Sequence, residues 1–467
     1  MWTKRIYVFL MSQRRAKRQK AIENQINRLG NRTAKLRALS RRLSWYRLVI
    51  FLIGAGLVFF LFFWISENLA WFSAGTAFII FSIIACYHHR LAIGIRRHQI
   101  WLEIKKSQIA RMELDWEKIP GSILQLPLSD LPFEKDLDIT GSRSIHQLID
   151  IAISHEGSRR LASWLLQKFP DLNGIHNRQK VIRELISLTR FRNRLLLNFR
   201  LVSGAQLEGK KLLDWLQTEP PSKSMKTLAT ISFVFAALNI ALFLWHQLGH
   251  IPPYWMLSLF IYIVFYLSNL KLLKHFFDVI AQLDDELSKF RKILKFLETY
   301  PYGDNNNLKA LCTPFLEHAT SPSRRLRKIK FVSTAIGLRM NPIMALFLNV
   351  AFPWDFFFST LINRYRAEIA EQLPQWLNTW EKLEASISLA DFAYLNPDYI
   401  FPEFISNERN KDQPILTAKD LGHPLIPADQ IVCNDFSLNK SGQAFIITGS
   451  NMSGKSSFLK TLGVNLC

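Results

Sequence analysis

Two long apolar stretches dominate the N-terminal part of the chain. Residues 48–65 contain no charged side chain, and a second uncharged stretch covers 69–87 after a short polar break. Each stretch is close to the roughly twenty residues with which a helix crosses a bilayer. The pattern predicts a transmembrane helical hairpin over 48–87, and a pair of buried core helices is the alternative.

A second pair of apolar stretches predicts another hairpin over 227–270. The stretches are 227–245 and 254–270, and the connection between them contains no Lys or Arg. Basic residues instead flank the outer ends of both hairpins, which is typical of flanks that stay in the cytoplasm. We therefore expect four spans in the inner (cytoplasmic) membrane, with both termini in the cytoplasm.

A third apolar region, 331–362, has a different pattern. It is interrupted by polar and helix-breaking residues: Arg339, Asn341, Pro342, Asn349, Pro353 and Asp355. No uncharged run long enough to cross a bilayer survives, and charged groups at its centre would be costly. We expect buried helices here, and a re-entrant or interfacial segment is the alternative.

The net charge of +22 is concentrated before the first apolar stretch. Residues 1–47 contain fourteen Lys or Arg residues and a single acid, Glu23. Such an excess points to an anionic partner, either the inner lipid leaflet or nucleic acid. We expect a solvated basic helix at the membrane surface, with a DNA-binding arm as the alternative. A smaller basic cluster at 324–330 allows the same two partners.

Outside the hairpins, apolar residues recur at three- and four-residue steps, which is typical of amphipathic helices. This pattern covers 145–149, 157–166 and 177–185, and a longer apolar and aromatic stripe covers 376–394. We expect the stripe to pack in a core. Its acidic residues are expected on other faces: Glu381, Glu384 and Asp391.

Signals for a protein metal site are weak. Adjacent carboxylates at 284–286 diverge on a helix and are expected on a solvated face. His88 and His89 lie at a predicted membrane end without a second ligand pair, and the four cysteines lack metal-ligand spacing. No site formed by these residues is expected.

The strongest chemical signal is a phosphate-binding pattern at 449–456. The residues GSNMSGKS fit GxxxxGK(S/T). The preceding apolar residues 444–447 predict a short buried strand, and residues 457–462 predict the opening of a helix. This strand–loop–helix context makes the pattern specific, although an ordinary Gly/Ser turn is the alternative.

Each residue type in the loop has a physical role in holding a nucleotide. Gly449 and Gly454 let successive backbone N–H groups face phosphate oxygens at the positive end of a helix. Lys455 is expected to reach the β- and γ-phosphates of ATP, and Ser456 to hold Mg²⁺. The sequence therefore predicts ATP and Mg²⁺ as cofactors.

The interior of the loop resembles the TGPNMGGKST loop of the MutS family, the DNA mismatch-repair ATPases. His423-Pro424 and Asn434-Asp435 resemble segments that precede this loop in the family. Ser450 and Ser453 depart from the family pattern and are similar to its membrane-attached branch. The resemblance implies these nucleotide contacts: Gly449, Ser450, Asn451, Met452, Ser453, Gly454, Lys455, Ser456, Ser457 and His423.

The helical segments also resemble MutS proteins. Residues 137–149, 157–166 and 177–185 look like the start of the MutS core domain. The implied fold is mostly α: a helical MutS-like core with two transmembrane hairpins, followed by the opening strand and P-loop helix of a truncated α/β ATPase domain. The expected segments are a basic arm (1–47), hairpin 1 (48–87), the first core half (88–226), hairpin 2 (227–270), the second core half (271–400) and the beginning of the ATPase domain (401–467).

The resemblance implies a membrane-anchored, MutS-like ATP-binding protein that acts as a homodimer and couples ATP binding to motion of its helical core. The Walker B strand, the signature loop and the dimerisation region are expected beyond Cys467, so enzyme status stays open. The family's F-x-E mismatch-reading motif is absent, and Phe133-Glu134 is the nearest string. The alternatives are an ATP-dependent DNA-binding or damage-sensing protein tethered at the membrane, and an inactive fragment.

Overall fold

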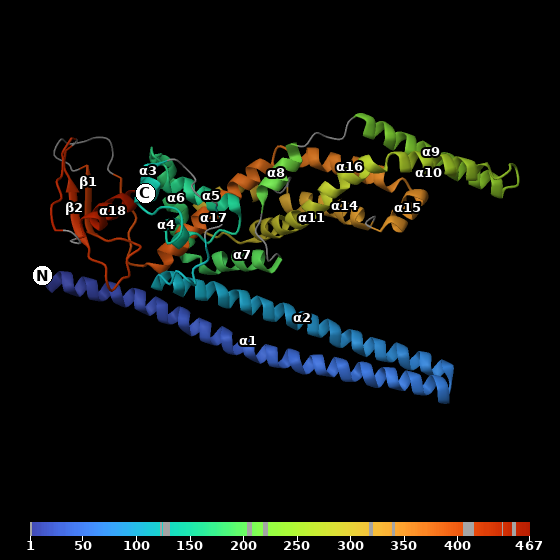
Figure 1. Cartoon of the computed structure of the whole chain (residues 1–467), viewed down its shortest axis with the longest axis horizontal. Helices are drawn as coiled ribbons and strands as arrows, with labels where there is room; N and C mark the ends of the chain where they lie inside the picture. Colours follow the sequence, from blue (N-terminus) through green and yellow to red (C-terminus); the bar gives the residue numbers. More distant parts are fainter. Residues whose placement is uncertain are drawn as a thin grey trace. The chain divides into compact units, whose positions relative to one another are not determined.

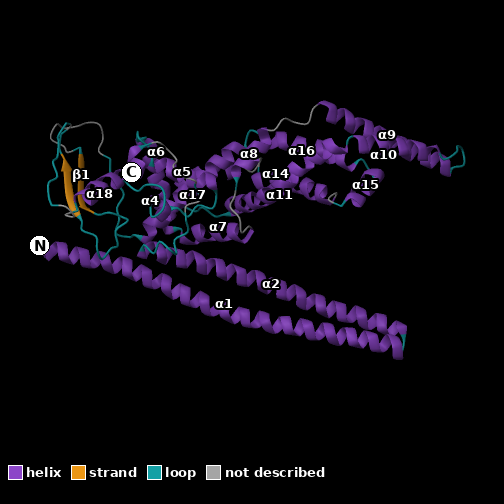
Figure 2. Ribbon diagram, viewed as in Figure 1, coloured by secondary structure: helices purple, strands orange, loops and turns teal. Residues whose placement is uncertain are grey.

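The described part of the chain is mostly helical (Figure 2). This computed structural model describes the backbone of residues 2–121, 124, 131–202, 208–217, 223–316, 321–338, 341–404, 415–440, 442–450 and 454–467. Arg339 and three loop residues of the phosphate-binding pattern, Asn451, Met452 and Ser453, lie outside these ranges. The chain divides into unit 1 (residues 1–149, 189–201 and 389–467) and unit 2 (residues 150–188 and 202–388).

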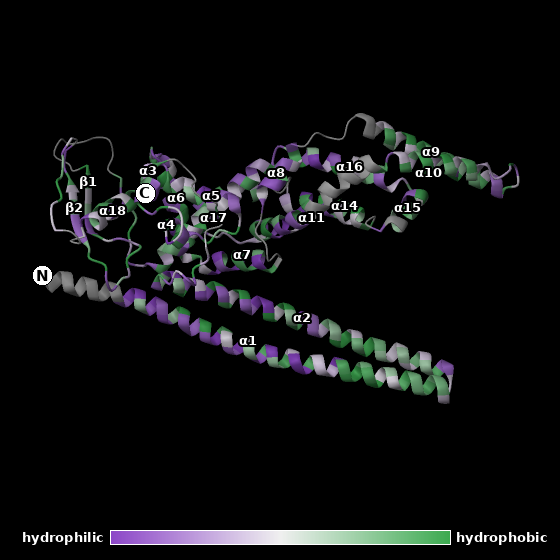
Figure 3. Ribbon diagram, in the orientation of Figure 1, coloured by the Kyte–Doolittle hydropathy of each residue, from purple (hydrophilic) through white to green (hydrophobic). Residues whose placement is uncertain are grey.

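Unit 1 contains a long helical hairpin, α1 (Trp2–Trp64) and α2 (Glu67–Glu113) (Figure 1). The predicted basic arm and the first apolar stretch form one uninterrupted helix. Hydrophobic residues gather toward the turn that joins α1 and α2, whereas hydrophilic residues are more frequent in the coloured parts of the pair farther from this turn (Figure 3). The side chains of Trp64 and Phe72 near this turn are each 76% exposed. The predicted first hairpin is therefore a helical pair whose apolar side chains face outward.

The hydrophilic end of the hairpin packs on the end of α17 (Leu373–Leu395). Ile22 of α1, Met112 of α2 and Leu395 of α17 form a buried apolar cluster. The Arg18 guanidinium donates to the Tyr394 carbonyl and lies 4.2 Å from the centre of the Tyr394 ring. This face of the basic arm is thus engaged by protein.

A buried polar network lies beside this cluster. Gln108 Nε2 donates to Asp391 Oδ1 over 2.8 Å, Lys105 Nζ donates to Gln108 Oε1 over 2.9 Å, and Arg192 Nη2 lies 3.5 Å from Asp391 Oδ1. Burial lowers the pKa of Lys105 and of Arg192, and the charge of Asp391 opposes both shifts. Asp391 is 3% exposed, so the face of α17 on which it lies is covered by protein as well as the apolar stripe. The network makes burial tolerable by supplying donors and a cation to the carboxylate.

The remaining described elements of unit 1 are helices and a two-stranded sheet. The helices are α3 (Pro132–Asp136), α4 (Ile145–Ile149), α7 (Thr189–Val202) and α18 (Lys455–Leu466). Strand β1 (Leu416–Leu421) pairs antiparallel with β2 (Asn434–Leu438), with Thr417 opposite Ser437. Residues 444–447 do not form the predicted buried strand, and Ile446 is 89% exposed. An apolar run becomes a buried strand only when neighbouring elements cover it. Within the described part of the chain, no strand pairs with residues 444–447.

Unit 2 is built entirely of helices in its described residues, and it contains α17 up to Ser388. Its other helices are α5 (His155–Leu165), α6 (Leu172–Ser187), α8 (Gly209–Gln217), α9 (Lys223–Gln247), α10 (Tyr254–Ser268), α11 (Leu270–Thr299), α12 (Asn306–Leu311), α13 (Thr313–Leu316), α14 (Pro322–Gly337), α15 (Pro342–Ala351) and α16 (Trp354–Ile369). Fully buried residues such as Phe290, Leu326 and Phe356 pack α11, α14 and α16 into one core. The helices predicted from periodicity at 145–149, 157–166 and 177–185 are confirmed as α4, α5 and α6.

By length and composition, three described helices are suited to cross a membrane. They comprise residues 13–64 of α1, all of α2, and residues 227–247 of α9. The fourth predicted span is shorter than expected, because α10 has 15 residues and ends at Ser268. The Asn269 side chain bonds back to the Phe265 carbonyl at this point, where α11 begins.

The third apolar region is only partly buried. Helix α16 buries Phe356, Phe358 and Ile362, as predicted. Helix α15 differs from the prediction, because Phe347 is 67% exposed. Residues 344–350 and α16 meet at 86° around Pro353 and would form a further candidate span if the bent pair were counted as one. The break includes Pro353, which is the N-cap residue of α16 and has no backbone N–H with which to continue the preceding helix.

Candidate functional site

The described part of the phosphate-binding pattern has the expected turn at its C-terminal end. Gly454 adopts the left-handed conformation, with φ of 84°, and α18 begins at the next residue, Lys455. A residue with a Cβ atom would be strained there, which explains the second glycine of the pattern. The predicted helix after the loop is confirmed.

The lysine and the serine of the pattern, Lys455 and Ser456, lie in the first turn of α18. Lys455 Nζ donates to the Gly449 carbonyl over 2.5 Å, so the side chain folds back over the loop. Ser456 is exposed. An anion at this turn would meet the positive end of the α18 dipole and the Lys455 ammonium. The arrangement fits a triphosphate with Mg²⁺. Lys455 would contact the phosphates, and Ser456 would contact the metal ion.

The opposite end of α18 is fastened to the segment that precedes α4. Lys460 Nζ lies 2.5 Å from Asp138 Oδ2, and a Cβ atom added to Gly463 would lie 2.6 Å from Leu137 Cδ2. A larger residue at 463 would therefore require the Leu137 side chain to shift. The sequence pattern places Asp138 in a segment that resembles the start of a core domain and makes no prediction about a contact with α18. No short-range signal could reveal this contact, because 322 residues separate Asp138 from Lys460.

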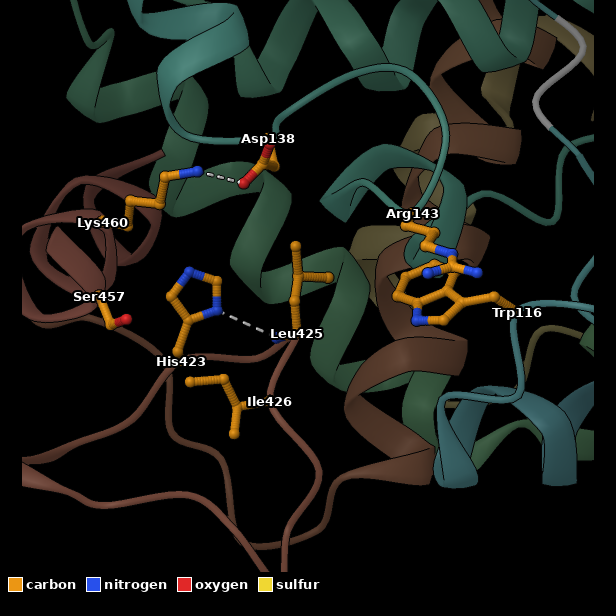
Figure 4. A pocket seen from close by; sticks show the side chains of 8 residues that line it. All are labelled: Trp116, Asp138, Arg143, His423, Leu425, Ile426, Ser457 and Lys460. Carbon is orange, nitrogen blue, oxygen red and sulfur yellow. Dashed lines mark hydrogen bonds and ion pairs between the residues drawn. The ribbon is translucent and has the colours of Figure 1, made fainter. Parts of the chain in front are cut away.

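A cavity of about 310 Å³ lies between α18, the loop after β1 and the residues before α4 (Figure 4). Its walls combine charged, aromatic and apolar side chains. The lining residues are Trp116, Asp138, Arg143, His423, Leu425, Ile426, Ser457 and Lys460. The structure thus brings together two predicted contacts, His423 and Ser457, in one wall.

His423 is 7% exposed and shapes the turn in which it lies. Its Nδ1 accepts a hydrogen bond from the Leu425 backbone N–H over 3.2 Å, which fixes the proton of the neutral ring on Nε2 (Figure 4). Burial lowers the pKa of His423, and the nearby Asp138 opposes that shift. The imidazole is therefore neutral at pH 7 and offers an N–H donor, not a charge.

The other residues that the sequence offered as possible ligand contacts have structural roles in the described part of the chain. Trp376 and Trp380 of the aromatic stripe are 2% and 1% exposed, which confirms core packing. Glu286 was expected on a solvated face, but it is 5% exposed and pairs with Lys289 over 2.8 Å. His88 contacts Ser40 Oγ at 2.9 Å. No cluster of three potential metal ligands occurs among the described residues.

Part of the chain is similar to curated MutS2 proteins. It is 36% identical over 117 residues to the endonuclease MutS2 of Caldicellulosiruptor bescii, covering 23% of this chain and 15% of that protein. It is 32% identical over 109 residues to the endonuclease MutS2 of Lacticaseibacillus casei, covering 22% and 13%. It is 35% identical over 74 residues to a putative endonuclease MutS2 of Bacillus subtilis, covering 16% and 9%.

These matches leave most of both chains unaligned, and no family model matches this chain. The matched segments span less than a sixth of each of these three relatives. The similarity therefore supports a partial, MutS-related kinship that covers about a fifth of this chain.

Proposed function

We propose that this chain is a membrane-anchored, MutS-like ATP-binding protein, and an ATPase when the remaining catalytic elements of such a domain are present. The observation that carries the proposal is the turn at Gly454, which places Lys455 and Ser456 on the first turn of α18. Bound ATP with Mg²⁺ would supply the free energy of nucleotide binding and hydrolysis. The chain's own contribution is to hold the phosphates with backbone N–H groups, Lys455 and Ser456.

The link between α18 and the segment before α4 supports a coupling role. A shift of α18 on nucleotide binding would act directly on Asp138 through Lys460, and on Leu137 through Gly463. Charged pairs and close helix contacts have discrete arrangements, so they transmit displacement better than a flexible loop does. We infer that this contact passes the nucleotide state to the helical core, with two copies of the chain closing as a homodimer.

Nucleotide binding by the full chain in detergent tests the proposal, with a fluorescent ATP analogue as the probe. Lys455→Ala removes the point charge that faces the β- and γ-phosphates, so we expect affinity to fall at least tenfold. Lys440→Ala is the matched control, because Lys440 is an exposed lysine upstream of the loop. Equal affinities for the two variants and the native chain would refute the assignment.

The membrane part of the proposal rests on the exposed apolar surfaces of α1, α2 and α9. An exposed apolar surface of this extent is unfavourable in water and favourable in lipid. Single cysteines introduced by substitution, after the native ones are replaced, should report the topology in intact cells. We expect labelling from outside at Glu67 and His250, and protection at Ser142, Arg324 and Ser450. Labelling of position 142 from outside would rule out the proposed orientation in the inner membrane.

A second candidate function, a DNA-binding or damage-sensing protein at the membrane, is favoured by the net charge of +22. The similarity to proteins named as endonucleases agrees with nucleic acid as a partner. If the chain is an inactive fragment, the native chain should not bind the fluorescent ATP analogue.

A further inference from the structure

The basic arm carries its charge as a stripe along one face of α1. Six exposed basic residues recur at intervals of 3, 4, 7 or 11 residues, which places them on the same side of a helix. These residues, the basic stripe, are Arg14, Lys17, Arg28, Arg32, Lys35 and Arg42. The face that packs on protein is a different one, marked by buried Ile22 and Thr33. The stripe therefore lies on a different side of α1 from this packed face, and only its N-terminal residue, Arg14, acts electrostatically on a described acid outside the hairpin, Asp398.

The continuity of α1 determines where the stripe can lie relative to a membrane. If residues 48–64 are within the bilayer, as the proposed function requires, the arm continues along the same helix axis into the cytoplasm. At about 1.5 Å per residue, Arg28 is about 30 Å along the helix from Leu48, and Arg14 about 51 Å. Even a helix tilted by about 40° keeps Arg28 about 23 Å above the span.

These heights exceed the reach of lipid charge. The potential of an anionic leaflet falls off within a Debye length, about 8 Å at physiological ionic strength. Only the last part of the stripe, at Arg42, lies close enough to be held by lipid headgroups. A basic helix lying on the membrane surface, as the charge pattern predicted, would require a break between arm and span. Helix α1 has none.

We propose that the basic stripe binds the phosphate backbone of double-stranded nucleic acid alongside the hairpin stalk, which comprises residues 13–47 of α1 and 88–113 of α2. The stripe is about 42 Å long, and a duplex lying beside it would present about one phosphate charge per 1.7 Å of its axis, counted over both strands. The stalk has few competing acids, namely Glu23, Glu103 and Glu113. Exposed Arg90, Arg96, Arg97 and Lys106 of α2 add to its positive charge.

The proposal deepens the proposed function, since it rests on the membrane spans and assigns a partner to the arm. Its contacts are with phosphates alone, so the binding should be indifferent to sequence and to mismatches. It should also depend steeply on salt, because each neutralised phosphate releases a counterion.

The experiment uses the full chain in nanodiscs of neutral phosphatidylcholine and a fluorescein-labelled 30-base-pair DNA duplex as the probe. For six phosphate contacts we expect the logarithm of the affinity to fall with a slope of about −5 against the logarithm of salt concentration. That slope corresponds to a loss of about a thousandfold between 50 and 200 mM salt. Replacing all six residues of the stripe by Gln should make the slope much shallower, and Gln preserves helix propensity.

The matched control keeps the charge at the same positions, through Arg14→Lys, Arg28→Lys, Arg32→Lys and Arg42→Lys. This variant should retain the slope of the native chain. Lys455→Ala should retain DNA binding while losing nucleotide affinity, so failure of the ATP site and failure of the stripe are distinguishable. Only protein that remains in nanodiscs is measured, which separates failure of membrane insertion from failure to bind DNA.

Two outcomes would overturn the proposal. One is an unchanged salt slope in the six-residue Gln variant. The other is contact of the stripe with lipid, measured with a fluorophore at position 24, after Asn24→Cys in a background without native cysteines. Asn24 is exposed and lies on the same face as the stripe. Quenching of this fluorophore by headgroup nitroxides in phosphatidylserine nanodiscs would show that lipid, not nucleic acid, covers the arm.

Discussion

Helix α17 contains two buried carboxylates that are stabilised in opposite ways. Asp391, in unit 1, has a cation and an amide as partners: Arg192 at 3.5 Å and Gln108 at 2.8 Å. Glu384, in unit 2, is surrounded by neutral donors, the backbone N–H groups of Ile153 at 2.9 Å and Ser154 at 3.2 Å. Both carboxylates are 3% exposed.

The difference shows what burial does to an acid with and without a nearby cation. Burial raises the pKa of Glu384 to about 8, and the hydrogen bonds from Ser154 and Ile153 only partly oppose this shift. Neutral donors stabilise a carboxylate less than a cation does, so desolvation dominates at Glu384. Helix α17 therefore contains a carboxylate paired with a cation, Asp391, and two turns earlier an acid that is easily protonated, Glu384.

The largest effect is expected from Arg192→Met, which removes the cation beside Asp391. An unpaired buried charge costs about 3–5 kcal/mol, so unit 1 should unfold at a much lower temperature. Thermal unfolding in detergent measures the change. In the double variant with Asp391→Asn most of the loss should be recovered, and no recovery would show that Arg192 acts through packing alone.

A smaller destabilisation is expected from Gly157→Ala in α5. A Cβ atom at this position would lie 2.3 Å from Glu384 Oε2, so the carboxylate must move away from its donors. Leaving buried groups without hydrogen bonds costs about 1–3 kcal/mol. Gly174→Ala in α6 is a suitable control, since the side chain it meets, Asp171, is exposed. Equal unfolding temperatures for the two variants would contradict the prediction.

Glu384→Gln should change the pH dependence of stability. Because the folded-state pKa of Glu384 lies above its ordinary value of 4.5, its protonation stabilises unit 2 fully below pH 4.5. That contribution is lost as pH rises through about 8, with a slope of up to about 1.4 kcal/mol per pH unit. We expect unfolding temperatures measured between pH 5 and 8 to fall less steeply in the variant. A parallel pH profile would show that Glu384 is ionised throughout.

The smallest effect is expected from Glu381→Gln, one turn before Glu384 on the same helix. Its ion pair with Arg160 has an N–O distance of 2.8 Å, but both side chains are partly exposed to solvent. Such pairs contribute about 0–1 kcal/mol and are screened by salt. The unfolding temperature should therefore change by no more than a few degrees, and less still in high salt.

These carboxylates also mark the limit of prediction from sequence. The apolar stripe of α17 was predicted correctly as packing, because Trp376, Trp380 and Leu383 recur at helical spacing. Glu384 and Asp391 were expected on other faces of the helix for the same reason, and both are buried there. Periodicity identifies the widest apolar face, but it does not show that other helices cover the remaining faces as well.

The candidate site shows the same division. The loop pattern identified Gly454, Lys455 and the start of α18, since these depend on local backbone geometry. The prediction of a strand before the loop was wrong, because a strand requires pairing partners that residues 444–447 do not have in the described part of the chain. The contact of Lys460 with Asp138 carried no local signal.

Local residue patterns were enough to predict the helical character of the chain, the apolar stretches, the basic charge before the first of them and the glycine-rich loop before α18. Each of these follows from residue types within a window of a few helical turns. The three-dimensional structure was needed to show that the basic arm and first apolar stretch are one helix, that α10 ends early at Ser268, and that Asp391 meets Arg192. The reason is physical: local pattern sets secondary structure, whereas burial and partner choice depend on segments hundreds of residues apart.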